Sequence, residues 1–215
     1  MTLAIRRAFL PLDPALRVPP HGRGQRIGLL GGSFNPPHAG HLHVSRIALR
    51  RLKLDAIWWL VTPGNPLKDN SGLPPIEQRI AACRDLVQDR RIVPTGCEEG
   101  FGTQFTADTL SVLVRRCPGV RFVWIMGADN LAGFHRWQRW STIAALMPIA
   151  VVDRPGSTLA SSRARAATAL SGFRQSENAA ARLVNSRPPA WIFLHGARSD
   201  LSSTALRRRN PARSP

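Results

Sequence analysis

Short apolar runs alternate along the chain with longer stretches in which apolar residues recur at helical spacing. Six runs have the length and the flanking Gly, Pro or charged residues of buried strands: 27–30, 56–61, 91–94, 121–126, 149–152 and 191–194. Helical spacing predicts helices over 39–53, 77–87, 106–116 and 142–146, and a short final helix over 202–209. Strands that alternate with helices form parallel sheets, so the pattern predicts an α/β fold with helices on both faces of the sheet.

A length of 215 residues suits one domain with a sizeable core. We expect a disordered N-terminal extension over 1–24, because 11–24 are rich in Pro and Gly, then a single domain over 25–209 and a basic tail over 210–215. Residues 153–190 are rich in Ala, Ser and Arg and poor in large apolar residues. They predict a surface excursion that adds little to the core, with a helix around 159–170.

Targeting signals and disulfide patterns are not evident in the sequence. No apolar run reaches the roughly 20 residues that cross a bilayer, and Pro11, Asp13 and Pro14 interrupt any secretory leader. The three cysteines have no C-x-x-C spacing, which argues against a disulfide framework or a zinc ribbon. These observations predict a cytoplasmic protein without a membrane partner.

The net charge of +17 implies attraction to polyanions such as nucleotides or nucleic acid. Only Lys53 and Lys68 are lysines, and the arginines are scattered among abundant Ala and Pro, which indicates compositional bias. A nucleic-acid-binding protein that uses its Arg-rich ends is therefore retained only as an alternative. The sequence leaves the oligomeric state open.

The segment G31-G-S-F-N-P-P-H-A-G-H41 lies between a predicted strand and a predicted helix. Paired glycines let backbone N–H groups approach phosphate oxygens, and the N-terminus of the next helix attracts anions. His38 and His41 are three positions apart, so we expect them to share one helix face and donate hydrogen bonds to a transferring phosphate. The segment predicts a phosphate site.

Plainer interpretations of this segment are a tight Gly-Gly turn and a pair of metal ligands. It matches neither G-x-G-x-x-G nor G-x-x-x-x-G-K-[ST]. No H-E-x-x-H glutamate or nearby Cys/Asp set would complete a zinc site beside His38 and His41, so we predict no protein-bound metal. The combination of strand, Gly-Gly, Pro-Pro, His-x-x-His and helix is more specific than any of its parts.

The same segment resembles the signature of the H-x-G-H adenylyltransferases, which share a Rossmann-like domain. Within that superfamily the chain resembles bacterial nicotinate-nucleotide adenylyltransferases, whose further motifs match in order across residues 26–209. The resemblance implies an ATP site that includes, in this first segment, Gly31, Gly32, Ser33, Phe34, His38 and His41.

A second phosphate-binding segment is implied near the C-terminus. D200-L-S-S-T-A-L-R207 resembles the family's I-S-S-T-x-I-R motif, with leucines at 201 and 206. The resemblance adds Ser203, Thr204 and Arg207 to the ATP site and makes Arg207 catalytic together with His38 and His41. Taken alone, the hydroxyl groups are equally explained as an ordinary helix N-cap.

Three central segments and one lysine resemble the family's site for nicotinate mononucleotide. Q104-F-T-A-D-T-L110 is similar to S-Y-T-x-x-T-L, with Phe105 in place of Tyr, and M126-G-A-D-N130 is similar to the family's G-A-D-N segment. F134-H-R-W-Q-R-W140 carries the tryptophan expected to stack on the pyridine ring. The implied acceptor-binding residues are Lys68, Phe105, Thr106, Asp129 and Trp137. Asp129 is equally explained as a helix cap, Trp137 as a core residue and Lys68 as a solvated loop residue.

The reaction implied by the resemblance belongs to NAD biosynthesis: ATP and nicotinate mononucleotide give nicotinate adenine dinucleotide and pyrophosphate, with Mg²⁺ accompanying the ATP. Other H-x-G-H transferases act on nicotinamide mononucleotide, phosphopantetheine or a cytidylyl acceptor. They remain alternatives for the substrate, although the 104–110 and 134–140 matches argue against them.

Overall fold

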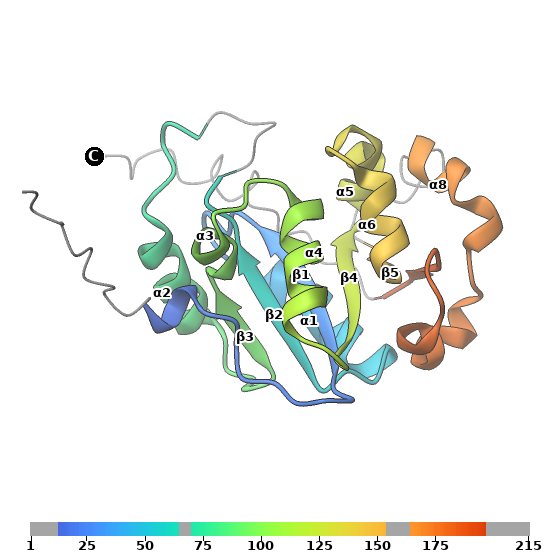
Figure 1. Ribbon diagram of the computed structural model, residues 1–215, viewed down its shortest axis with the longest axis horizontal. Coiled ribbons are helices and arrows are strands. Elements are labelled where there is room, and N and C mark those ends of the chain that lie inside the picture. The colour runs from blue at the N-terminus through green and yellow to red at the C-terminus, as the bar shows by residue number, and fades with distance from the viewer. Residues whose placement is uncertain (1–12, 65–69, 154–163, 197–215) are drawn as a thin grey trace, which may run out of the picture.

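The computed structural model describes residues 13–64, 70–153 and 164–196. A twisted parallel sheet forms its centre (Figure 1). The strands are β1 (Arg26–Gly32), β2 (Ala56–Val61), β3 (Ile92–Thr95), β4 (Arg121–Gly127), β5 (Ile149–Val152) and β6 (Trp191–Leu194). All pairings are parallel, in the order β3-β2-β1-β4-β5-β6. This is the strand order of Rossmann-like folds, and it confirms the predicted fold class.

Helices cover both faces of the sheet. One face carries α1 (Ala39–Arg51), α2 (Ile76–Leu86) and the 3-10 segment η4 (Glu177–Asn185). The other carries α3 (Cys97–Phe101), α4 (Thr106–Arg116), α5 (Ala128–Gly133), α6 (Trp140–Leu146) and α8 (Arg165–Ala169). Within the described ranges, no helix is both long and apolar enough to cross a membrane.

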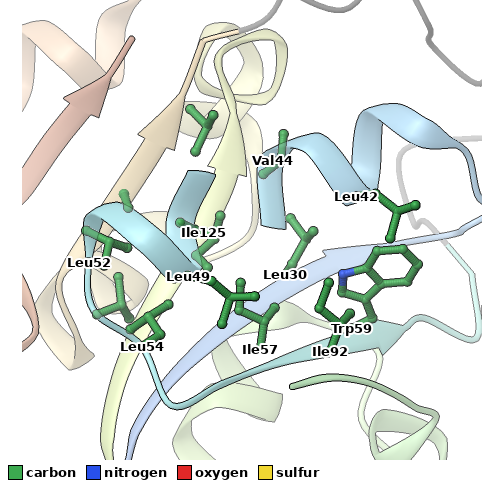
Figure 2. Packing of buried hydrophobic residues seen from close by; sticks show 14 of the residues in the cluster. Leu30, Leu42, Val44, Leu49, Leu52, Leu54, Ile57, Trp59, Ile92 and Ile125 are labelled. Carbon is green, nitrogen blue, oxygen red and sulfur yellow. The ribbon is translucent and has the colours of Figure 1, made fainter. Parts of the chain in front are cut away.

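Helix α1 is held on the sheet by the apolar face that its sequence predicts. Val44, Ala48 and Leu52 are fully buried, whereas Ile47 is partly buried. Figure 2 shows the side chains of this helix packed against β1, β2 and β4, including Leu30 and Ile125. Burial of a Val or Leu side chain contributes about 1.5–3 kcal/mol, so Val44 and Leu52 hold α1 firmly on the sheet.

The N-terminal segment corrects one expectation. We predicted a disordered extension over 1–24, but the described part, 13–24, packs against the domain. Its 3-10 helix η1 (Pro14–Leu16) is capped by Asp13, and Ala15 is buried. Gly96 N–H donates to the Ala15 carbonyl, and the Thr95 hydroxyl donates to the Arg17 carbonyl. The Pro content suggested disorder, yet Pro14 starts a helix at a position where its missing N–H costs nothing.

The segment before β6 corrects a second expectation. Residues 153–190 were predicted to add little to the core, but in their described part alanines and two branched residues are buried: Ala164, Ala166, Ala167, Ala180, Leu183 and Val184. Small side chains let α8 and η4 approach their neighbours closely, so a segment with few large apolar residues still fills space. Of the helix expected around 159–170, the described part contains the short helix α8 (Arg165–Ala169), and 154–163 lie outside the described residues.

The strand order creates a divergence point at the carboxyl ends of the strands. From β1 the chain passes through α1 to β2 on one side, whereas β4 lies on the other side of β1. The segments that follow β1 and β4 therefore leave the sheet in different directions. Open α/β sheets bind ligands in the crevice that such a divergence creates.

Candidate active site

The segment between β1 and α1 lies at this divergence point. Phe34 adopts φ = 47°, in the left-handed region, and its buried ring stacks on Trp59 of β2 with ring centroids 4.9 Å apart. Gly31 is required for close packing, because a Cβ there would lie 2.6 Å from Trp124 Cη2. The Phe34 side chain thus attaches the loop to the core beside β2. Next to β4, Gly31 presents no side chain, so the backbone lies close to Trp124.

His38 and His41 are brought together as predicted, but in a different way. His38 is the N-cap of α1, with extended backbone, and not part of a helix face. Its Nδ1 accepts from Gly40 N–H at 3.0 Å, while His41 Nδ1 accepts from His38 N–H at 3.2 Å, and the ring centroids are 4.0 Å apart. A nitrogen that accepts carries no proton, so each neutral ring has its proton on Nε2. Both rings are thereby fixed as Nε2–H donors beside the positive end of the helix dipole.

The first turn of α1 is attached to β2 through Ser45. Trp59 Nε1–H donates to Ser45 Oγ at 2.8 Å, and the Ser45 hydroxyl donates to the His41 carbonyl at 2.9 Å. Both Ser45 and Trp59 are fully buried. These two hydrogen bonds fix the position of the His41 backbone relative to β2. Sequence reasoning missed Ser45, although a polar residue on a predicted apolar helix face is a readable signal.

Arg79 is a second residue that sequence reasoning missed. Its side chain is buried in α2, and its guanidinium donates to backbone carbonyls of Ser33, Thr62, Pro63 and Pro74. Burial lowers the pKa of Arg79, although an arginine remains charged. The available signal was an arginine on the same helix face as the buried Ile76 and Ile80.

The predicted acceptor segment 104–110 forms the start of α4. Phe105 is its N-cap and provides no side-chain cap, and both Phe105 and Thr106 are partly exposed. The first N–H groups of a helix have no partner within the helix, so this terminus suits an anionic group such as a carboxylate.

Glu98 of α3 is hydrogen-bonded to α4 and so supports this segment. Sequence reasoning missed this residue. Thr109 of α4 donates to Glu98 Oε1 at 2.8 Å, and the Thr109 and Thr103 hydroxyls are 2.8 Å apart. Burial raises the pKa of the Glu98 carboxyl to about 7, and Oε2 has no hydrogen-bond partner among the described residues. The carboxyl is therefore about half protonated near pH 7 and largely protonated below it.

Asp129 and Trp137 follow β4 on the other side of the divergence point. The N-cap of α5 is Gly127, so the interpretation of Asp129 as the helix cap is wrong; it is exposed in the first turn. Trp137 is partly buried and packs edge-on against Trp124 and Phe134, with centroids 6.2 and 5.4 Å away. One part of the indole contacts the core, and another part remains available for a ligand.

Four predicted site residues, Lys68, Ser203, Thr204 and Arg207, lie outside the described residues. The chain before the last three is placed as far as Gly196, where a Cβ would lie 2.3 Å from Ile47 Cδ1 of α1. Within 13–64, 70–153 and 164–196, no group of three or more His, Cys, Asp or Glu side chains is arranged to hold a metal ion.

Comparisons with known proteins agree on one family. The cytidylyltransferase-like family matches residues 29–209. A protein of Methylorubrum extorquens, described as a probable nicotinate-nucleotide adenylyltransferase, is 62% identical over 184 residues, which are 86% of this chain and all of that protein. A protein of Agrobacterium fabrum with the same description is 58% identical, over 84% of this chain and 97% of its own length.

Solved structures share the fold at low sequence identity. The nicotinic acid mononucleotide adenylyltransferase of Plasmodium falciparum, complexed with NaAD, superposes with a TM-score of 0.63 at 15% identity. The match covers 86% of this chain and 83% of that one. Identity this low supports the fold alone, whereas the closer relatives support the family.

Proposed function

Because the chain belongs to the cytidylyltransferase-like family and, within it, to the nicotinate-nucleotide adenylyltransferases, we propose that it converts ATP and nicotinate mononucleotide to nicotinate adenine dinucleotide and pyrophosphate. This is a nucleotidyltransferase reaction of NAD biosynthesis. The structural observation that carries the proposal is the His38 and His41 pair, fixed as two donors at the anion-binding end of α1.

The chemistry is a direct displacement. An oxygen of the acceptor's phosphate attacks the α-phosphorus of ATP, a P–O bond forms, the bond to the bridging oxygen breaks, and pyrophosphate leaves with the electron pair. No protein nucleophile takes part. The protein contributes alignment and charge stabilisation, and the Nε2–H groups of His38 and His41 are suited to oxygens on which charge accumulates.

We assign ATP binding to the β1–α1 segment and to Ser203, Thr204 and Arg207. Gly31, Gly32, Ser33 and Phe34 would shape the phosphate pocket, and Arg207 would hold the leaving pyrophosphate with its planar guanidinium. Contact of Gly196 with α1 supports this, because it brings the chain toward the helix that carries the histidines. Mg²⁺ would arrive as part of the MgATP substrate, bound mainly by phosphates and water.

The acceptor would lie across the divergence point from the histidines. Backbone N–H groups at Phe105 and Thr106 would bind the pyridine carboxylate, Trp137 would stack on the ring, Asp129 would bind ribose hydroxyls, and Lys68 would bind phosphate. The uncapped start of α4 and the partial exposure of Trp137 support this assignment.

We keep a single nucleotidyltransferase domain over 25–209, with 13–24 packed on it, and a basic tail over 210–215 that lies outside the described residues. We also propose a cytoplasmic location. Cys83, Cys97 and Cys117 are free and buried, which is typical of proteins in a reducing compartment.

An acceptor comparison tests the function. Purified protein is given MgATP with nicotinate mononucleotide, nicotinamide mononucleotide or phosphopantetheine, and pyrophosphate and dinucleotide are measured. We expect the highest kcat/KM with nicotinate mononucleotide, because the α4 terminus favours a carboxylate over a neutral amide. A preference for another acceptor would overturn the substrate assignment but not adenylyl transfer, and absence of pyrophosphate with all three would overturn both.

A further inference from the structure

Arg79 is buried at the carboxyl edge of the sheet, and its hydrogen bonds within the described residues all go to main-chain carbonyls. Nη1 donates to the carbonyls of Ser33 at 2.8 Å and Thr62 at 2.7 Å. Nε donates to Pro74 at 2.9 Å, and Nη2 contacts the Pro63 carbonyl at 3.4 Å. The side chain is 4% exposed. One cation thus connects three segments of the chain.

Packing alone does not explain an arginine at this position. Its neighbours on the buried face of α2 are Ile76, Ile80 and Cys83, and an apolar residue would complete that face without desolvating a charge. Burial of a cation is unfavourable unless its donors are satisfied. Because the guanidinium of Arg79 is satisfied by main-chain carbonyls, its role is to be sought in the segments that carry those carbonyls.

Two of those segments border the proposed phosphate site. Ser33 directly precedes Phe34, whose left-handed backbone directs the loop toward His38 and His41. Thr62 and Pro63 follow β2, and Thr62 N–H also donates to the Gly32 carbonyl at 3.0 Å. Since carbonyl oxygens repel phosphate, their engagement by a guanidinium also removes unfavourable dipoles from the anion site.

We propose that Arg79 is a positioning residue for adenylyl transfer: by binding the Ser33, Thr62 and Pro63 carbonyls, it fixes the β1–α1 loop in the shape that receives the phosphates of MgATP. Arg79 acts through the loop and does not touch the substrate. The inference rests on the proposed function, since it concerns the same site. It predicts a defect that is larger for ATP than for the acceptor, because the acceptor segments 104–110 and 134–140 are not among its contacts, although Lys68 is linked to it through the chain that follows Pro63.

Arg79→Lys and Arg79→Met test this proposal. Lysine keeps the charge, but a single ammonium cannot reproduce the fork that reaches carbonyls in different directions. Because small errors in alignment are costly in transfer reactions, we expect kcat/KM for ATP to fall about 10- to 100-fold in both variants, with the KM for nicotinate mononucleotide unchanged within about twofold. The matched control is Arg84→Met, an exposed arginine on the same helix.

Two readouts separate positioning from general destabilisation. A merely unstable variant loses active enzyme, which lowers kcat with both substrates and leaves both KM values unchanged. If Arg79 fixes the shape of the loop, its loss instead raises the KM for ATP more than the KM for the acceptor. The second readout is chemical rescue: in a further variant, Arg79→Ala, added guanidinium ion at non-denaturing concentrations should restore part of the activity.

The proposal is overturned if the Arg79 variants match Arg84→Met in ATP kinetics, if both substrates are affected equally, or if neither Arg79→Lys nor Arg79→Met folds. Failure of the proposed function is seen separately, because then the parent protein itself would form no nicotinate adenine dinucleotide.

Discussion

In the proposed function, His38 and His41 would each perform two tasks with one imidazole: capping α1 and donating to a phosphate oxygen. The Nδ1 atoms complete a reciprocal cap on α1, and this use fixes the proton of the neutral ring on Nε2. Because the cap and the donor occupy opposite sides of the ring, stability and catalysis can be separated by substitution.

His38→Asn and His38→Ala separate these two tasks. Asparagine is a good N-cap but lacks the imidazole donor, so we expect His38→Asn to keep the stability of the parent while His38→Ala loses about 1 kcal/mol. Both should lose about 100-fold or more in kcat, as expected when a charge-stabilising donor is removed. Urea unfolding and pyrophosphate release measure the two effects. Full activity in His38→Asn would show that the imidazole is only a cap.

Glu98→Gln tests the buried carboxyl. Burial raises its pKa in the folded protein to about 7 from an ordinary 4.5, so folding favours the protonated form. That contribution is complete below the unfolded pKa and is lost as the pH rises through 7, amounting to about 3 kcal/mol. Glutamine keeps an acceptor for Thr109 and does not ionise. We expect the parent to lose about 3 kcal/mol more stability than the variant between about pH 4.5 and pH 7 in urea titrations, with no further difference above that range. Parallel curves would contradict this.

At the scale of elements, periodicity predicted the regular part of the fold. The predicted strands 56–61, 149–152 and 191–194 and the helix 106–116 have the observed bounds. These elements are buried on regular faces, so hydrophobic spacing alone marks their limits. Helices α3 and α5 were missed because each has six residues or fewer and begins immediately or almost immediately after a strand, which leaves too few residues for a helical period to show.

The part of the candidate site that lies within one continuous motif could be predicted from the sequence. The residues that hold this motif in place from distant positions in the chain could not. The pairing of His38 with His41 follows from local spacing. The Arg79 bonds to Ser33 span 46 positions and depend on how α2 docks, which no local pattern encodes. Glu98 was missed for the same reason, because its burial results from the packing of α3 under α4.

Gly31→Ala tests the close packing of β1 against the Trp124 side chain of β4. The new Cβ would meet the Trp124 ring at 2.6 Å, and Trp124 packs in turn against Trp137. Because this ring is too rigid to yield cheaply, we expect a loss of about 1–3 kcal/mol and a higher KM for the acceptor. Gly22→Ala is the matched control, since nothing lies within 4 Å of its Cβ. Steady-state kinetics and thermal unfolding give the comparison; equal behaviour of the two variants would show that the contact is unimportant.

At the scale of the molecule, segments that look dispensable in sequence complete the core. The 13–24 segment covers Thr95 and Gly96, and Leu16 and Val18 pack against the two apolar clusters on opposite faces of the sheet. Amino-acid composition did not predict that 13–24 pack on the domain. A segment that follows the surface of a domain needs only a few buried apolar residues and main-chain hydrogen bonds to be ordered. Pro and Gly are compatible with that role.

Two truncations test the role of this segment. Removal of residues 2–24 should lower the free energy of unfolding by about 2–4 kcal/mol, because it uncovers the contacts of Ala15, Leu16 and Val18. Removal of residues 2–12 only should leave it nearly unchanged, since it spares every contact described for the segment. Chemical denaturation of both proteins beside the parent provides the measurement. Equal stability after both truncations would mean that the segment adds nothing to folding.

The two outer strands of the sheet have consequences for how copies of this protein meet. Strand β3 is four residues long and includes Pro94, which has no N–H to offer, and just beyond it Gly96 is bonded to Ala15. On the opposite side, Gln175 N–H donates to the Trp191 carbonyl of β6. Short, proline-containing and partly covered margins are poor templates for strand addition. Self-association, where it occurs, should therefore proceed through helices and loops, and the protein should resist the strand-to-strand growth that leads to fibrils.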